Sequence, residues 1–372
     1  MRKILINPFY LYSISWTITL VFYKINIIKV FPKLSLELEI FLILSILFSI
    51  FLGKTLRIKR IKFTKNFEDK ILFIIIIIGW VLTFLYERKI PLIEAMRKTG
   101  YIYIDFKGIP TISPLIYTLT TYHSIKNYIQ YLIFKEKKYL LYFTIEICFY
   151  LLGYRRGPIL IIFIANFLSY VYIRGIKNLL LKGIIISFIV AYLFGILGNI
   201  RHGFSPLDTR MLKAIVFLNT EESFFDPLLW VYTYITSPLS NLQHTLEINN
   251  ITFNIFEYIR RNFFLDFIQK RFQGYTNIKL LIPVLTVQTG YNSSIINLGM
   301  LGAWITYITY MSFGYLYLKL MKNTEYYFII LLLLGITNIF FIFDNMYVNS
   351  AIGVTIIYPL VFYILKKIIK NN

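Results

Sequence analysis

Apolar runs alternate with short charged connections along almost the whole chain, and the pattern is that of membrane-crossing helices. Ten runs meet this description: Met1 to about Tyr23, Leu38–Leu52, Ile71–Tyr86, Ser113–Phe134, Tyr139–Leu152, Ile159–Ile173, Gly183–Gly198, Ile295–Leu318, Tyr326–Phe343 and Met346–Leu365. We therefore expect an all-α, polytopic integral membrane protein with about ten transmembrane helices and a single transmembrane domain over residues 1–372.

One hydrophilic stretch, residues 199–290, is far longer than any other connection and predicts a large loop between the seventh and eighth spans. Within it, Leu228–Ile235 is apolar but too short to span, and Ser237-Pro238 is expected to end it. The segment Ile255–Phe272 places aromatic and apolar residues on one face, as in an amphipathic helix lying along the membrane surface.

Composition supports this class of protein and excludes several others. Hydrophobic residues make up 58% of the chain and aromatic residues 19%, and the mean hydropathy is +0.66. The single Cys148 rules out a disulfide within the chain, and the wide spacing of the three histidines predicts no metal site. The net charge of +21 fits basic loops beside anionic lipid, so no nucleic-acid partner is expected.

The basic clusters set the predicted orientation. Seven basic residues between Lys54 and Lys70 mark the cytoplasmic side, which places both chain termini in the cytoplasm and the long loop outside. In this orientation arginine supplies 9 of the 18 basic residues outside but only 4 of the 20 inside. Because the arginine fork binds phosphate and carboxylate at two points, this bias points to a polyanionic ligand on the outer side.

Two adjacent arginines, Arg155 and Arg156, lie between the fifth and sixth spans. Gly153 and the Gly157-Pro158 pair allow one helix to end and the next to begin there. The 16 residues between Lys138 and Arg155 form roughly 24 Å of helix, against a hydrocarbon core of about 30 Å. The pair is thus expected at or just below the outer surface, where it either reaches lipid phosphates or forms a site for a phosphate-bearing lipid substrate.

A second polar pair is expected inside the membrane. Lys126 and Glu146 lie ten residues on either side of Glu136, at similar depth on neighbouring antiparallel helices. We predict that they form an ion pair, because either charge alone is costly in hydrocarbon. An ion- or proton-coupling site is the alternative, and His123, one turn away, is assigned a buried structural role.

The long loop carries the candidate chemistry. Arg201-His202 leaves the seventh span, where arginine could hold a phosphate and histidine could move a proton. Acidic side chains able to accept a proton from a hydroxyl follow, so the candidate catalytic residues are His202, Asp208, Glu221 and Glu222.

Four features together resemble the bacterial O-antigen (oligosaccharide repeat-unit) polymerases, over about residues 70–320. They are a GxRRG-type turn at Gly153–Gly157, Arg201 after the next outward span, a Tyr-x-x-x-Pro-Leu-x-Asn segment at Tyr234–Asn241, and small residues in the returning helix at Asn297, Gly299 and Gly302.

The resemblance implies glycosyl transfer at the outer face of the bacterial cytoplasmic (inner) membrane, without a cofactor or metal. Its substrates would be oligosaccharide donors and acceptors on undecaprenyl diphosphate, with membrane lipid and a chain-length regulator protein as further partners. Cations aimed at the departing diphosphate would stabilise its developing charge. Arg155, Arg156 and Arg201 match the family pattern as diphosphate ligands, and Arg210, Arg260 and Arg261 are further candidates.

Two other functions remain open at this stage. A flippase or transporter of lipid-linked oligosaccharide is expected to have about twelve evenly spaced spans, short loops and charges at mid-membrane. An O-antigen ligase-type glycosyltransferase shares the spans, arginines and large loop, so the sequence separates it poorly from a polymerase.

Overall fold

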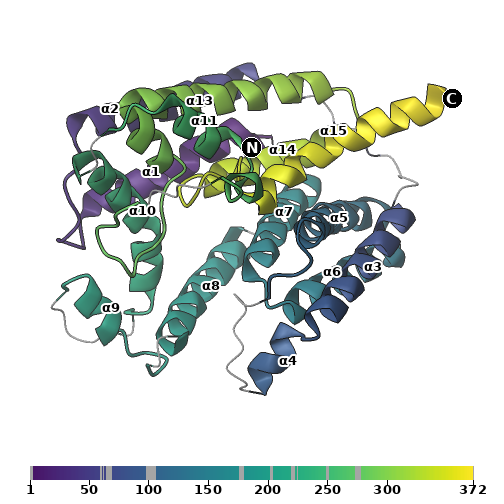
Figure 1. The fold of residues 1–372 in the computed structure, drawn as a ribbon, viewed down its shortest axis with the longest axis horizontal. Helices are drawn as coiled ribbons and strands as arrows, with labels where there is room; N and C mark the ends of the chain where they lie inside the picture. The colour runs from purple at the N-terminus through teal and green to yellow at the C-terminus, as the bar shows by residue number, and fades with distance from the viewer. Residues whose placement is uncertain are drawn as a thin grey trace.

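The computed structural model describes residues 3–58, 61, 63, 69–97, 106–175, 180–201, 204–218, 223, 225–248, 251–272 and 278–371. All regular secondary structure in these residues is α-helical (Figure 1). The ten principal helices are α1 (Pro8–Ile25), α2 (Leu36–Thr55), α3 (Asp69–Glu87), α5 (Ile112–Phe134), α6 (Lys137–Leu152), α7 (Arg156–Arg174), α8 (Leu180–Arg201), α13 (Asn292–Met321), α14 (Tyr327–Phe340) and α15 (Ser350–Asn371). The connections carry the short helices α4 (Pro91–Met96), α9 (Arg210–Ile215), α11 (Ile255–Phe263) and α12 (Asp266–Gln269), and also the 21-residue helix α10 (Leu228–Ile248).

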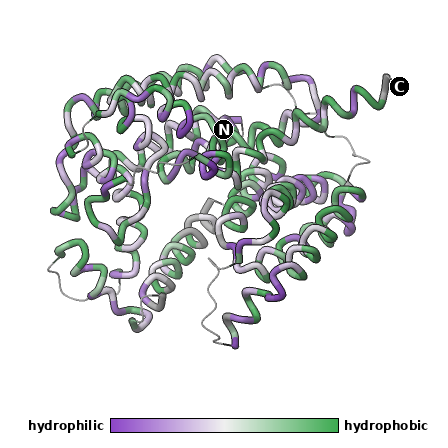
Figure 2. The backbone as a smooth tube through the Cα atoms, viewed as in Figure 1, coloured by the Kyte–Doolittle hydropathy of each residue, from purple (hydrophilic) through white to green (hydrophobic). Residues whose placement is uncertain are grey.

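Each of the ten apolar runs predicted from the sequence forms one of the ten principal helices. Among the described residues, four helical segments are long and apolar enough to cross a membrane: Leu36–Thr55, Lys70–Glu87, Gly157–Arg174 and Ser350–Ile369. The apolar helix α14 is shorter. Large apolar side chains such as Leu47, Phe51 and Ile78 are more than half exposed, and hydrophobic residues recur along the helices (Figure 2). Together these features indicate a helical membrane protein.

Helix α5 packs against four other helices, α3, α6, α7 and α15. Helix α5 forms the predicted hairpin with α6. In this hairpin the buried His123 Nδ1 atom is hydrogen-bonded to the buried Glu146 carboxylate. Ser124 Oγ donates to the other Glu146 oxygen at 2.7 Å. The predicted burial of His123 is therefore confirmed. Lys126 and Glu325 both line a separate small cavity. Pairing of Lys126 with Glu146 stays a prediction.

A buried aromatic cluster joins α1, α2 and the start of α13. The hydroxyls of Tyr12 and Tyr291 lie 2.7 Å apart, and Tyr307 bonds with Ser49 at 2.7 Å. Each of these tyrosines is buried, and each hydroxyl has a polar partner, which removes the cost of burying it.

The predicted end of the short apolar segment at Ser237-Pro238 is wrong. Helix α10 continues through Pro238 to Ile248, and its buried face packs on α8, α1 and α13. Proline removes one helical hydrogen bond, but packing along most of the helix outweighs that loss.

The prediction of a single amphipathic helix over Ile255–Phe272 is also wrong. The structure divides it into α11 and the one-turn α12, because Phe264 and Leu265 adopt extended backbone conformations between them. This break lets α12 turn toward the connection between α14 and α15, where the Asp266 N–H donates to Val348 O at 2.9 Å.

Helix α13 is interrupted at Gly299, whose φ of 61° and ψ of −154° are not helical. This conformation is open essentially to glycine alone. The interruption frees the carbonyls of Ile296 and Asn297, which accept hydrogen bonds from the N–H groups of Thr252 and Asn254. The small-residue segment of the predicted return helix thus anchors the chain that leads into α11.

Candidate functional site

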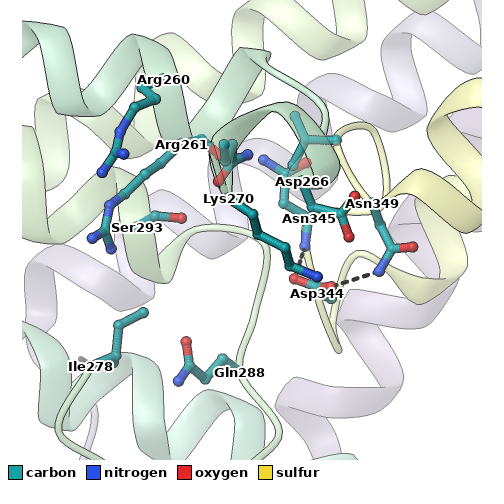
Figure 3. Close-up of a pocket in the computed structure, with 12 residues that line it drawn as sticks. Arg260, Arg261, Asp266, Lys270, Ile278, Gln288, Ser293, Asp344, Asn345 and Asn349 are labelled. Atoms are coloured by element: carbon teal, nitrogen blue, oxygen red, sulfur yellow. Dashed lines mark hydrogen bonds between the residues drawn. The ribbon is translucent and has the colours of Figure 1, made fainter. Parts of the chain in front are cut away.

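A polar cavity of about 420 Å³ lies where α11, α12, the start of α13 and the α14–α15 connection meet (Figure 3). Arg260, Arg261 and Ser293 lie on one side of it, which we call the arginine wall. On the opposite side, the acidic wall carries Asp266, Asp344, Asn345 and Asn349, and Lys270 extends between the two walls.

The amphipathic pattern of α11 builds the arginine wall. Ile255, Phe256 and Ile259 are exposed on its outer face, whereas Arg260 is only 2% exposed and Arg261 8%. Packing of α11 on α13 keeps this orientation. The arginines therefore point into the protein rather than along the outer surface of the helix.

Glu257 positions both guanidinium groups. Its Oε2 atom lies 2.5 Å from Arg260 Nη2 and 3.3 Å from Arg261 Nε. The backbone N–H of Glu257 donates to the side chain of Asn254, which caps α11. One carboxylate facing two guanidinium groups leaves a net positive charge on this wall, which suits an anionic group.

The acidic wall holds its carboxylates by backbone and amide hydrogen bonds. Asp344 Oδ1 accepts from the N–H of Asn345 at 2.7 Å, and Oδ2 accepts from the Asn349 amide at 3.0 Å. Asp266 Oδ1 accepts from the N–H of Ser350 at 3.2 Å. Burial, together with the charge of Asp344, raises the pKa of Asp266 above its ordinary value, although Lys270 opposes the effect.

Asn345 adds an uncharged acceptor to this wall. The residue is only 4% exposed, and its amide nitrogen donates to Tyr310 Oη at 3.0 Å. Within the described part of the chain its Oδ1 atom has no hydrogen-bond partner. A buried acceptor in this state is suited to a hydroxyl of a bound molecule.

An apolar groove of about 660 Å³ adjoins the polar cavity. It is lined by α7, α8 and α10, and by Val287, Phe340 and Phe343. The next residues along the chain, Gln288 and Asp344, line the polar cavity instead. Two chain segments therefore present an apolar side chain to the groove and a polar one to the cavity, so the two spaces share a wall.

The motif residues of the long loop shape this wall. Asn241, buried in α10, donates to the carbonyls of Leu285 at 2.9 Å and Val287 at 2.8 Å. Its Oδ1 atom accepts from the N–H of Leu281 at 3.1 Å. Tyr234 lines the groove. A segment that carries part of the family resemblance thus fixes the connection that separates groove from cavity.

Arg155 lies outside this cavity. Its guanidinium carbon is 3.9 Å from the centre of the Tyr117 ring, and Nη2 donates to Phe106 O at 3.3 Å. Arg155 follows the end of α6 and precedes α7, as the glycines predicted. Arg271, the residue after the cavity-lining Lys270, donates from Nη2 to Thr111, just before α5, at 3.4 Å.

Asp208 and Arg210 bind each other in the segment between α8 and α9. Arg210 donates from Nε at 3.0 Å and from Nη2 at 2.7 Å to the two carboxylate oxygens. These hydrogen bonds hold the pKa of Asp208 below its ordinary value. Neither residue lines the polar cavity. The side chains of Arg156 and Arg201, and the whole of His202, Glu221 and Glu222, lie outside the described residues.

Sequence reasoning missed the acidic wall. Asp344 and Asn345 stand in a short connection between two apolar runs, on the side of the membrane expected for the long loop. That position was the available signal. Asp266 was hidden inside the segment interpreted as one amphipathic helix. In the described residues, no group of three or more His, Cys, Asp and Glu side chains is arranged to hold a metal ion.

The fold and the site together define a helical membrane protein with a charged cavity beside an apolar groove. Comparisons with protein-family models, with curated proteins and with solved structures gave no match.

Proposed function

We propose that this protein polymerises lipid-linked oligosaccharide repeat units by glycosyl transfer at the outer face of a bacterial cytoplasmic membrane, as O-antigen polymerases do. The principal support is the shared wall between the polar cavity and the apolar groove. A substrate with a long isoprenoid tail and a diphosphate head needs both environments side by side.

We further propose that the chain crosses the membrane about ten times and that both of its termini lie in the cytoplasm. The helix ends around the cavity support this alternation, because α13 and α15 begin there while α14 ends there. The Gly290 N–H donates a hydrogen bond to Phe341 O at 2.9 Å. This bond joins the end of α14 to the start of α13. The cavity then faces the outside, with the long loop.

The arginine wall would bind the diphosphate. As the bond between the anomeric carbon and the phosphate oxygen breaks, negative charge grows on the diphosphate. Arg260 and Arg261 are already fixed by Glu257, so they can meet this charge without rearrangement. The three arginines that match the family pattern, Arg155, Arg156 and Arg201, would serve the entry or orientation of the same head group.

An O-antigen ligase-type transferase would use the same donor, and only its acceptor would differ. A flippase needs a passage through the membrane instead of a cavity at one end. Deletion of the gene distinguishes these functions. A polymerase deletion leaves surface glycan carrying a single repeat unit, whereas complete loss of surface glycan would favour the flippase or ligase.

Substitution tests the cavity directly. Arg260→Ala and Arg261→Ala are each expected to slow chain growth by about 10²–10³-fold, the usual cost of removing one donor to a developing anion. Arg57→Ala, which removes an exposed arginine beyond α2, serves as the matched control. Wild-type chain lengths in both cavity variants, with normal protein levels, would refute the assignment of this cavity.

A further inference from the structure

We infer that Asp344 is the general base that accepts the proton of the attacking sugar hydroxyl, and that the acidic wall is the acceptor-sugar subsite. This inference rests on the proposed glycosyl transfer and assigns the second half of its site.

The neighbours of the candidate carboxylates identify Asp344 as the best placed to act as the base. Asp208 is paired with Arg210, Asp226 with Lys213 at 2.7 Å, and Glu257 with the two arginines. The carboxylates that line the cavity are Asp266 and Asp344, and Asp266 is the more enclosed of the two. Asp344 is exposed and lies across the cavity from the arginine wall (Figure 3).

The hydrogen bonds of Asp344 suit this role. Asn345 N–H and the Asn349 amide each hold one carboxylate oxygen, which fixes the orientation of the group and leaves further lone pairs open. Other charged groups around it are Asp266 on α12 and Lys270, whose side chain extends toward Asp344. Lys270 provides a cation beside the base, and Asp266 a second negative charge.

The rest of the wall suits a sugar. Gln288, Asn345 and Asn349 offer amide groups, and the Asn345 Oδ1 atom lacks a partner among the described residues. Uncharged amides and carboxylates can accept and donate the hydrogen bonds of several neighbouring hydroxyls. A diphosphate would be repelled by this side, so the two walls divide the substrates between them.

The resulting step balances. The acceptor hydroxyl oxygen forms a bond to the anomeric carbon of the donor sugar, and its proton passes to the Asp344 carboxylate. The bond from that carbon to the diphosphate oxygen breaks, and its electron pair leaves with the diphosphate beside Arg260 and Arg261. Asp344 then releases the proton to water.

The test uses the full-length protein in vesicles with purified undecaprenyl-diphosphate-linked repeat units. Asp344→Asn is expected to lower the rate of chain growth by about 10²–10⁴-fold, the usual contribution of a general base, with unchanged binding of the lipid-linked unit. Asp344→Glu should retain part of the rate, because it keeps a carboxylate at the same position. Glu136→Gln, a carboxylate change at the far end of α5, is the control.

Chemical rescue of the Asp344→Ala variant distinguishes a general base from a residue with a purely structural role. Added formate should restore part of the activity of Asp344→Ala, because the small anion can occupy the vacated place and accept the proton. A wild-type rate in Asp344→Asn, or Asp344→Ala activity that formate does not change, would overturn the assignment of the base. If Arg260→Ala is slow in the same assay, the proposed function and its cavity survive that failure. If the wild-type protein does not extend the lipid-linked units at all, the proposed function falls.

Discussion

The side-chain amide of Asn241 donates a hydrogen bond to the carbonyl oxygen of Val287 at 2.8 Å, between a helix and a connection 46 residues away. This contact holds the connection that separates the apolar groove from the polar cavity. The same side chain satisfies two further backbone groups of that connection, at Leu281 and Leu285. One buried amide therefore fixes the position of the shared wall.

Asn241→Ala is expected to release this connection. Each backbone group left buried without a partner costs about 1–3 kcal/mol, so the melting temperature in detergent should fall. Proteolysis within residues 278–290 should increase. Asn323→Ala, which removes an exposed amide after α13, should leave both measurements unchanged. A stable Asn241→Ala protein with an unchanged cleavage pattern would contradict this account of the wall.

Gly299→Ala should destabilise the interruption of α13. Its positive φ strains any side chain, and an added Cβ atom would lie 2.9 Å from Ile251 Cδ1. The strain of such a conformation is of order 1–3 kcal/mol, which a thermal melt would detect. Gly183→Ala is the matched comparison, because that position lies within α8 and has open space for a Cβ. It should be neutral or stabilising by up to about 1 kcal/mol; similar losses at both positions would argue against a special conformation at Gly299.

The pH dependence of stability should carry the signature of Asp266. Its pKa is raised in the folded protein, so the folded state binds more protons than the unfolded state just above the ordinary value of 3.8. Stability contributed by this group is present at low pH and is lost as the pH rises through the raised pKa. Asp266→Asn should therefore melt at a higher temperature than wild type at neutral pH, and the difference should shrink toward pH 3.8.

Asp208, whose pKa is shifted in the opposite direction, provides the control for that measurement. The pKa of Asp208 is lowered by Arg210, so its contribution is present at neutral pH and disappears as the pH falls through the lowered value. Asp208→Asn should then be neutral or slightly destabilising at neutral pH. A higher melting temperature for Asp208→Asn than for Asp266→Asn would show that the two environments are wrongly described.

The sequence predicted the helices better than the site. Apolar runs located ten of the eleven long helices in the described residues, all except α10, because hydrophobicity acts locally along the chain. The course of α10 through Pro238 and the break at Phe264 and Leu265 were missed, since packing on other helices decides both. Arg260 and Arg261 were identified as candidates from their chemistry. Asp344 was not, because its place beside the arginines depends on contacts across more than 80 residues of chain.

The two walls of the cavity are tied to each other as well as to their own supports, because Gln269 of α12 donates to Arg261 O at 3.2 Å and Asn345 donates to the Tyr310 hydroxyl, which in turn bonds to Asn262 O of α11. Thr252 and Asn254 tie the arginine helix to the segment of α13 that carries Ser293, whereas Asp266 is tied to Val348 and Ser350. The separation of the two walls is therefore fixed by side-chain hydrogen bonds as well as by the covalent chain through Phe264 and Leu265.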